Sequence, residues 1–285
     1  GLVGSEMCIR DSLVGLQFDG VMMHTSIDVN GCKVGEHHYG YSPFYVDLTD
    51  YVTFGEENRI TINVNTGVQP SSRWYTGSGL FRGVTLCHSP RVFILPDGIN
   101  VVTREVTDQI AFLEAQVEIG NETLENHMVE VKVELWKEGE PEEKAVAEAR
   151  RMIEVGKNNR ETARISIHLS DPVLWDAENP NLYIVKATVT DQSVFRTHSN
   201  PVPIQTVDEA QTLFGIRTIT VDSVRGLRIN GKPVKLKGGC VHHDNGLLGA
   251  VSLYECEERK IRKLKETGFN AVRTAHNPPS GALVE

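Results

Sequence analysis

The residues best suited to chemistry form two polar clusters near the carboxyl end of the chain. The run His242-His243-Asp244 follows one short apolar stretch, and Arg273 with His276-Asn277 follows another. An amphipathic segment separates the clusters, which gives the strand–helix–strand order of a parallel α/β fold. Because such folds carry their reactive groups at the carboxyl ends of neighbouring strands, we expect the two clusters to share one hollow.

The residue types in these clusters favour binding of a sugar. Imidazole and guanidinium groups can hold hydroxyls without competing as nucleophiles, so we expect His242, Arg273 and His276 to face one pyranose-shaped hollow. A metal-dependent hydrolase is the competing interpretation, since His242, His243, Asp244 and His276 are all potential metal ligands. Adjacent residues of a strand point to opposite faces, however, so His242 and His243 are poorly placed to share one ion.

The segment between the clusters is predicted to be one amphipathic helix. Ser252 is a favourable N-cap, and Glu255 three residues later would complete a capping box. Gly268 is expected just after the helix, where a left-handed backbone conformation is common. The buried stripe of this helix is predicted to comprise Leu253, Ile261 and Leu264.

Composition indicates a globular protein and argues against several classes of partner. The 285 residues are 24% charged and 40% hydrophobic, as in ordinary globular domains. A net charge of −9 argues against nucleic acid or an anionic membrane as partner, and no apolar run is long enough to span a bilayer. The five cysteines show no CxxC spacing, so we expect mostly buried free thiols rather than a disulfide framework.

Two β-domains are predicted ahead of the polar clusters, over residues 13–96 and 97–213. In the first, Asn30-Gly31 between two short runs is a strong hairpin signal, and Arg59–Asn65 alternates between apolar and polar residues. In the second, Met128–Trp136 alternates in the same way. Both patterns predict antiparallel sandwiches with one wet and one buried face.

Residues 1–12 do not fit the pattern of the rest of the chain. The run Glu6–Asp11 is similar to the translation of a sequencing-library adapter, so we interpret residues 1–12 as an assembly artefact that replaces the natural amino terminus. A disordered natural terminus is the alternative. Without the natural terminus, a cytoplasmic and a periplasmic or secreted location both stay open.

The carboxyl-terminal clusters and their surroundings resemble glycoside hydrolase family 2, and within it the β-galactosidase branch. The resemblance is carried by Lys237–Gly249, with its His-His-Asp run, and by Gly268–Pro279, which contains Asn-Ala-Val-Arg-x-x-His-x-Pro. It implies a mostly β chain in three parts: a truncated jelly-roll sugar-binding domain over residues 13–96, an immunoglobulin-like β-sandwich over 97–213, and the first βαβ portion of a TIM (β/α)8 barrel over 214–285.

The same resemblance implies roles for individual residues. His242 and His276 would line the sugar subsite, and Arg273 would orient the catalytic carboxylates beside it. Asp244 would fix one of the two adjacent histidines. Asn277 stands where relatives vary and is included as a further substrate-binding residue.

Further expectations concern the first barrel strands and a loop of the first sandwich. Lys235–Lys237 would be the first barrel strand and Ala271-Val272 the second. The resemblance also implies that the loop containing Arg73 and Trp74 helps close the sugar pocket, and an aromatic face beside a charged donor suits a sugar. Alternatively, Trp74 packs at the sandwich edge and Arg73 pairs with a carboxylate.

The implied activity is that of a retaining hydrolase acting on terminal β-galactosides. Such hydrolysis needs one carboxylic acid and one carboxylate, and in the family both are glutamates on later barrel strands. We therefore expect them beyond residue 285, and we expect the chain to be an inactive fragment without a cofactor. The full-length enzyme would be a homo-oligomer and could use a divalent or monovalent metal. The alternatives are a relative acting on β-glucuronides or β-mannosides and a noncatalytic carbohydrate-binding scaffold.

Overall fold

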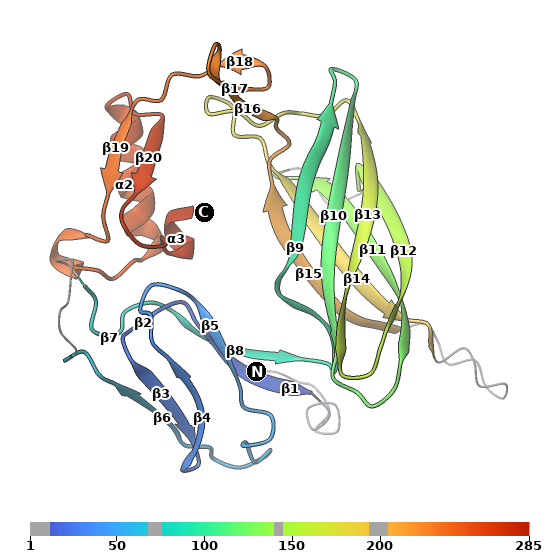
Figure 1. Ribbon diagram of the computed structural model, residues 1–285, viewed down its shortest axis with the longest axis vertical. Helices are drawn as coiled ribbons and strands as arrows, with labels where there is room; N and C mark the ends of the chain where they lie inside the picture. The colour runs from blue at the N-terminus through green and yellow to red at the C-terminus, as the bar shows by residue number, and fades with distance from the viewer. Residues whose placement is uncertain (1–11, 68–75, 140–144, 194–204, 285) are drawn as a thin grey trace. The chain divides into compact units, whose positions relative to one another are not determined.

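The computed structural model describes residues 12–67, 76–139, 145–193 and 205–284. The chain divides into two compact units, one formed by residues 1–88 with 236–285 and the other by residues 89–235. Within the described ranges, no helix combines the length and apolar character needed to cross a bilayer. Strands dominate both units, as expected (Figure 1). The domain boundaries drawn from the sequence at residues 96 and 213 stay predictions.

The first unit begins with a β-sandwich of short strands. Its described strands form three sheets, in the orders β5-β1-β8, β4-β3-β6 and β2-β7. The strands are β1 (Leu13–Phe18), β2 (Val21–Met22), β3 (Thr25–Val29), β4 (Cys32–His37), β5 (Phe44–Asp47), β6 (Ile60–Val64), β7 (Gly79–Leu80) and β8 (Val84–Ser89). Alternation along these strands buries one face, and the buried core comprises Leu16, Phe18, Val21, Ile27, Val29, Val46 and Leu48.

The hairpin predicted at Asn30-Gly31 is confirmed. Val29 pairs with Cys32, so the turn between β3 and β4 has two residues. Asn30 has a φ of 50° and Gly31 a φ of 86°, the left-handed values that such a tight turn requires.

The second unit contains the predicted immunoglobulin-like sandwich. Its strands pair antiparallel in two sheets, β13-β10-β9 and β12-β11-β14-β15, which form the two layers in Figure 1. They are β9 (Val92–Val106), β10 (Ile110–Asn121), β11 (His127–Lys137), β12 (Ala147–Val155), β13 (Asn159–Ser170), β14 (Tyr183–Asp191) and β15 (Gln205–Phe214). Side chains from both sheets form one apolar core.

A small three-stranded sheet follows the sandwich within the second unit. It comprises β16 (Ile219–Asp222), β17 (Gly226–Ile229) and β18 (Lys232–Pro233). Asn230 and Gly231, with φ values of 51° and 73°, form a two-residue turn between β17 and β18. The Asn230 Nδ2 donates to the Trp175 carbonyl at 3.0 Å, so the turn is tied to the connection before β14.

The carboxyl-terminal part of the first unit is a strand–helix–strand arrangement. It comprises β19 (Gly238–Val241), the 3-10 helix η2 (Gly246–Leu248), α2 (Tyr254–Glu266), β20 (Ala271–Thr274) and α3 (Gly281–Val284). We call these elements and their connections the barrel segment, residues 236–284. The strands β19 and β20 pair in parallel, as expected for the start of a barrel. The first strand was misplaced, however: it covers Gly238–Val241 and not Lys235–Lys237.

The two ends of α2 differ in how well the sequence predicted them. Leu253 occupies the N-cap position without a side-chain cap, so the capping box of Ser252 and Glu255 is wrong. The carboxyl end is confirmed, because Gly268 has a φ of 90°. The Gly268 N–H donates to the Lys265 carbonyl at 2.9 Å, which satisfies a carbonyl of the last turn.

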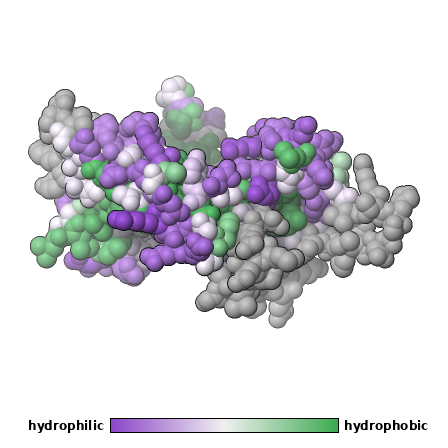
Figure 2. Space-filling model, turned by 90° about the horizontal axis from the view of Figure 1, so that it is seen from below, coloured by the Kyte–Doolittle hydropathy of each residue, from purple (hydrophilic) through white to green (hydrophobic). Residues whose placement is uncertain are grey.

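The described cysteines are free thiols, as predicted, but the expectation that most are buried is wrong. Cys32 and Cys240 are exposed, and Cys87 and Cys256 are partly exposed. Cys32 lies in β4 at the edge of its sheet, and the described sheet of Cys240 has only two strands. In the face shown in Figure 2, hydrophilic residues cover much of the described surface, with hydrophobic groups between them.

Candidate functional site

The parallel pair β19 and β20 brings the two predicted polar clusters together. Cys240 lies opposite Arg273 and Val241 opposite Thr274 in the pairing register. The first strand includes Gly238, where a Cβ would lie 1.9 Å from the Ala271 carbonyl oxygen. Only glycine permits the backbones of β19 and β20 to approach this closely. The glycine at position 238 therefore allows the strand pair to begin there.

His242 and His276 follow the two strands and lie side by side. Their ring centroids are 5.3 Å apart with an interplanar angle of 71°. Both residues are exposed to solvent. Two imidazoles at this separation offer ring nitrogens that can donate to or accept from neighbouring hydroxyl groups.

His243 points elsewhere, as expected for a neighbour on an extended backbone. Its ring stacks on Tyr41 with centroids 4.7 Å apart and an interplanar angle of 27°. The Nε2 atom of His243 is buried and has no hydrogen-bond partner. Burial lowers the pKa of His243, and the positive charge of Arg82 lowers it further. Within the described ranges, no group of three or more His, Cys, Asp or Glu side chains is arranged to hold a metal ion.

Arg273 and Asp244 have described contacts close to them in the fold, and the roles expected for both stay predictions. The Arg273 Nη1 donates to the Cys240 Sγ at 3.4 Å across the strand pair. The Asp244 Oδ1 accepts from the Gly246 N–H at 3.1 Å, so its carboxylate takes part in shaping the loop after β19. The predicted loop residues Arg73 and Trp74 lie outside the described residues.

Asn277, next to His276, is held by a residue that the sequence did not reveal. The Tyr39 hydroxyl donates to the Asn277 Oδ1 at 2.8 Å. Tyr39 belongs to the connection between β4 and β5, so the amino-terminal sandwich reaches the end of β20. No periodicity or spacing signals a contact between residues so distant in the sequence.

Arg82 makes a second link between the sandwich and the barrel segment. Its guanidinium donates to the Tyr41 carbonyl at 2.9 Å and to the Pro278 carbonyl at 3.0 Å. The same group lies over the rings of Tyr41 and Phe81, at 5.7 and 5.3 Å from their centroids. Burial lowers the pKa of Arg82, although Tyr41 and nearby carboxylates oppose that shift. The guanidinium thus fixes the backbone just beyond His276.

A buried carboxylate ties the loops after β19 and β20 to α2. Glu257, which is 4% exposed, accepts from Asn245 Nδ2 at 2.7 Å, Ser252 Oγ at 2.8 Å and Lys260 Nζ at 2.7 Å. Ser252 also contacts Ser280 Oγ at 2.6 Å. Burial raises the pKa of Glu257, but the hydrogen bonds outweigh it and the net shift is downward. Ser252, expected to be a helix cap, is used in this network instead.

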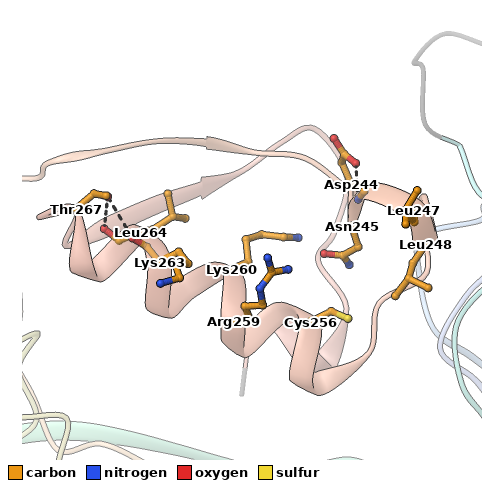
Figure 3. Close-up of a pocket in the computed structure, with 11 residues that line it drawn as sticks. Asp244, Asn245, Leu247, Leu248, Cys256, Arg259, Lys260, Lys263, Leu264 and Thr267 are labelled. Carbon is orange, nitrogen blue, oxygen red and sulfur yellow. Dashed lines mark hydrogen bonds between the residues drawn. The ribbon is translucent and has the colours of Figure 1, made fainter.

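A cavity of about 670 Å³ is lined by the loop that follows β19 and by α2 (Figure 3). Leu247 and Leu248 border it, together with basic side chains of the helix, Arg259, Lys260 and Lys263. Among the described site residues predicted from the sequence, Asp244 alone lines it. The cavity is therefore separate from the pair formed by His242 and His276.

Two models of one protein family match the chain. The model of the sugar binding domain of glycosyl hydrolases family 2 matches residues 5–90. The model of glycosyl hydrolases family 2 itself matches residues 97–217. The two matches are adjacent and together cover most of the chain.

Individual relatives give similar results. The β-galactosidase BoGH2A of Bacteroides ovatus is 34% identical over 273 residues, which are 95% of this chain and 30% of that protein. A putative β-glucuronidase of Formosa agariphila is 29% identical over 268 residues, 93% of this chain and 24% of that protein. A crystal structure of a glycosyl hydrolase family 2 member from Bacteroides cellulosilyticus matches with a TM-score of 0.87 and 35% identity, over 96% of this chain and 33% of that one. The chain thus spans at most 33% of the length of each.

Proposed function

Because the chain belongs to glycosyl hydrolase family 2, we propose that it is part of a retaining glycosidase that cleaves terminal β-galactosides. The observation that carries this proposal is the pairing of His242 with His276, whose rings lie 5.3 Å apart after two parallel strands. In barrel enzymes this end of the strands is where substrates bind. The two imidazoles would hold adjacent hydroxyls of one pyranose ring.

The other predicted residues act around this pair. Arg273, in β20, would orient a catalytic carboxylate once one is present, and in its absence contacts the Cys240 thiol. Asn277 would add a neutral donor, and Asp244 would support the loop that carries His242. Arg73 and Trp74 stay proposed contributors from the first sandwich.

The carboxylates that perform the hydrolysis are expected outside this sequence. A retaining mechanism requires two carboxyl groups about 5 to 5.5 Å apart, one as acid and base and the other as nucleophile. We propose that later barrel strands of the whole protein supply both. The modest share of its relatives that the chain spans, 30% of the Bacteroides ovatus protein, accords with this expectation.

For the identity of the sugar, a β-glucuronide is a specific alternative to the β-galactoside. One similar protein bears the name β-galactosidase and another the name putative β-glucuronidase. A glucuronide would add a carboxylate to the ligand, and Arg273 is an exposed cation three residues before His276. We favour the galactoside because the β-galactosidase is the more similar of these two curated relatives, at 34% against 29% identity.

Turnover of nitrophenyl glycosides tests both parts of the proposal. We expect no turnover by the 285-residue chain, and turnover of the β-galactoside in preference to the β-glucuronide and β-mannoside by a chain extended in frame past Glu285. Turnover by the shorter chain would contradict the location of the carboxylates. Preference of the longer chain for the glucuronide would contradict the substrate, and sugar binding without any turnover would indicate a noncatalytic carbohydrate-binding protein.

A further inference from the structure

The hydrogen bond between Tyr39 and Asn277 determines which way an amide beside the histidine pair is turned. The Tyr39 hydroxyl donates to the Asn277 Oδ1 at 2.8 Å. A side-chain amide has one oxygen and one amino group on opposite edges, so engaging the oxygen fixes the edge on which the two N–H donors lie. The sandwich thereby controls the orientation of a group that follows β20 directly after His276.

The amino group of Asn277 is left available by this arrangement. Among the described residues, its Nδ2 makes no hydrogen bond, and it is not one of the buried polar atoms that lack a partner. It therefore reaches solvent in a residue adjacent to His276. An oriented amide with free N–H donors can bind only a hydrogen-bond acceptor, such as a hydroxyl, ring or carboxylate oxygen of a sugar.

Tyr39 is itself kept in place by neighbouring rings. Its ring is tilted against that of Tyr41, with centroids 6.0 Å apart. Tyr41 is 6% exposed, stacks on His243 and accepts a hydrogen bond from Arg82 through its carbonyl. Tyr39 is 44% exposed, so water could replace the contact of its hydroxyl at little loss in folding stability. The main effect of this hydrogen bond is therefore to orient the Asn277 side chain.

We propose that Tyr39 is a positioning residue of the sugar subsite. By holding the Asn277 oxygen, it presents the Asn277 amino group to an acceptor oxygen of a pyranoside bound at His242 and His276. This inference rests on the proposed function, since it takes the histidine pair to be the sugar subsite. It adds a residue of the amino-terminal sandwich that does not touch the sugar and acts through Asn277.

The first arm of the test examines the hydrogen bond without sugar. In Tyr39→Phe, which removes only the hydroxyl, we expect the side-chain amide signals of Asn277 in a nitrogen–proton NMR spectrum to move. Those signals are identified by their loss in Asn277→Ala. The matched control is Tyr51→Phe, because Tyr51 belongs to the same sandwich and is 43% exposed, close to the 44% of Tyr39. Unchanged Asn277 signals in Tyr39→Phe would overturn the proposal.

The second arm measures binding of methyl β-D-galactopyranoside to the full 285-residue chain. Loss of one orienting hydrogen bond should weaken binding by about two- to tenfold in Tyr39→Phe and leave Tyr51→Phe at the wild-type affinity. In an Asn277→Ala background, Tyr39→Phe should have no further effect, because its action passes through Asn277. Additive losses in this cycle, or equal losses in both tyrosine variants, would overturn the positioning role.

The two arms separate the possible failures. If the wild-type chain does not bind the galactoside, the sugar subsite is wrong and the role of Tyr39 in it is overturned, even where the Asn277 signals respond to Tyr39→Phe. If the chain binds the galactoside but the Asn277 signals do not respond, the proposed function stands and the positioning role alone fails.

Discussion

The immunoglobulin-like sandwich and the barrel segment differ in how far their large apolar side chains are buried. In the sandwich, Val129, Val131, Val133 and Leu135 alternate along β11, and each is 0% exposed. In the barrel segment, large apolar side chains face solvent: Leu247 is 107%, Leu253 48% and Val272 38% exposed. The expectation that Leu253 belongs to a buried stripe is thus wrong.

The difference follows from the kind of sheet each region contains. An antiparallel sandwich buries the inner faces of two sheets against each other and needs no further element. A parallel pair needs cover on both faces, and helices normally provide it. The barrel segment has one helix of 13 residues and two paired strands of four residues each within the described ranges. Its order depends instead on polar contacts, among them those of Arg82, Glu257 and Asn277.

The largest expected effect is a core deletion in the sandwich. Leu135→Ala should lower the free energy of unfolding by about 3 kcal/mol, because it removes a fully buried side chain and leaves a cavity. Urea unfolding followed by tryptophan fluorescence would measure this loss, since Trp136 and Trp175 both belong to the second unit.

Two controls decide whether burial is the cause. Leu213→Ala, on β15 of the same sheet, removes a side chain that is 50% exposed, and Leu247→Ala removes one that is 107% exposed. Each should change the free energy of unfolding by less than about 0.5 kcal/mol. A loss in Leu247→Ala as large as that in Leu135→Ala would remove the contrast between the two regions.

Arg82 gives the next largest effect, and this one should be confined to the barrel segment and its neighbours. Arg82→Met keeps the aliphatic stem but leaves the Tyr41 and Pro278 carbonyls without their donor. We expect a loss of about 2 kcal/mol in the opening free energy of amides in β20, measured by hydrogen exchange. Arg59→Met is the control, because Arg59 is exposed and its side chain makes no described contact. Equal losses in both variants would show that the guanidinium does not hold the segment.

The features that could be predicted from the sequence are those set by neighbouring residues, such as turns, strand alternation and the end of a helix. The Asn30-Gly31 turn needs left-handed backbone, and alternation along β11 places every second side chain inward. Gly268 ends α2 for the same local reason. The neighbouring positions of His242 and His276 followed from the rule that polar groups gather after parallel strands, and the rings lie 5.3 Å apart.

What could not be predicted depends on contacts between distant segments. The first barrel strand begins at Gly238 because the backbone of β20 approaches it closely, which the Lys-Leu-Lys run over residues 235–237 does not indicate. Ser252 looked like a helix cap, but its hydroxyl donates to the buried Glu257 carboxylate. The contacts of Tyr39 and Arg82 with the residues after β20 have no signature in spacing or periodicity.

Glu257→Gln is expected to have a smaller effect than Arg82→Met, since glutamine keeps one acceptor oxygen while methionine keeps no donor. Glu257→Gln removes the charge that pairs with Lys260 and replaces an acceptor oxygen by a donor. We expect a loss of about 1 to 2 kcal/mol in the opening free energy of α2 amides, again by hydrogen exchange. Glu258→Gln is the control, because Glu258 pairs with Arg262 on the exposed face of the same helix. A similar loss in the control would point to general charge loss rather than to the buried network.

The smallest expected effect is a pH dependence that should appear in the barrel segment and not in the immunoglobulin-like sandwich. Burial lowers the pKa of His243, with Arg82 adding to the shift, while a hydrogen bond with the Asn277 backbone and the charge of Glu257 oppose it and Lys260 adds a minor further lowering. Since the folded-state pKa lies below the unfolded one, the unfolded chain binds the proton more readily. Stability is therefore undiminished above the ordinary histidine pKa of about 6.5 and falls as the pH drops below it.

Amide exchange of β19 and α2, corrected for its intrinsic pH dependence, measures this loss. Between pH values of about 7.5 and 5.5, on either side of the ordinary histidine pKa, the opening free energy should fall more steeply in the wild type than in His243→Gln. His88→Gln, at an exposed position, should keep the wild-type slope. Identical slopes in all three proteins would show that protonation of His243, which packs against Tyr41, does not change the opening free energy of this segment. A slope in β11 that depends on His243 would show that the sandwich does not hold its core independently of the segment that carries the site.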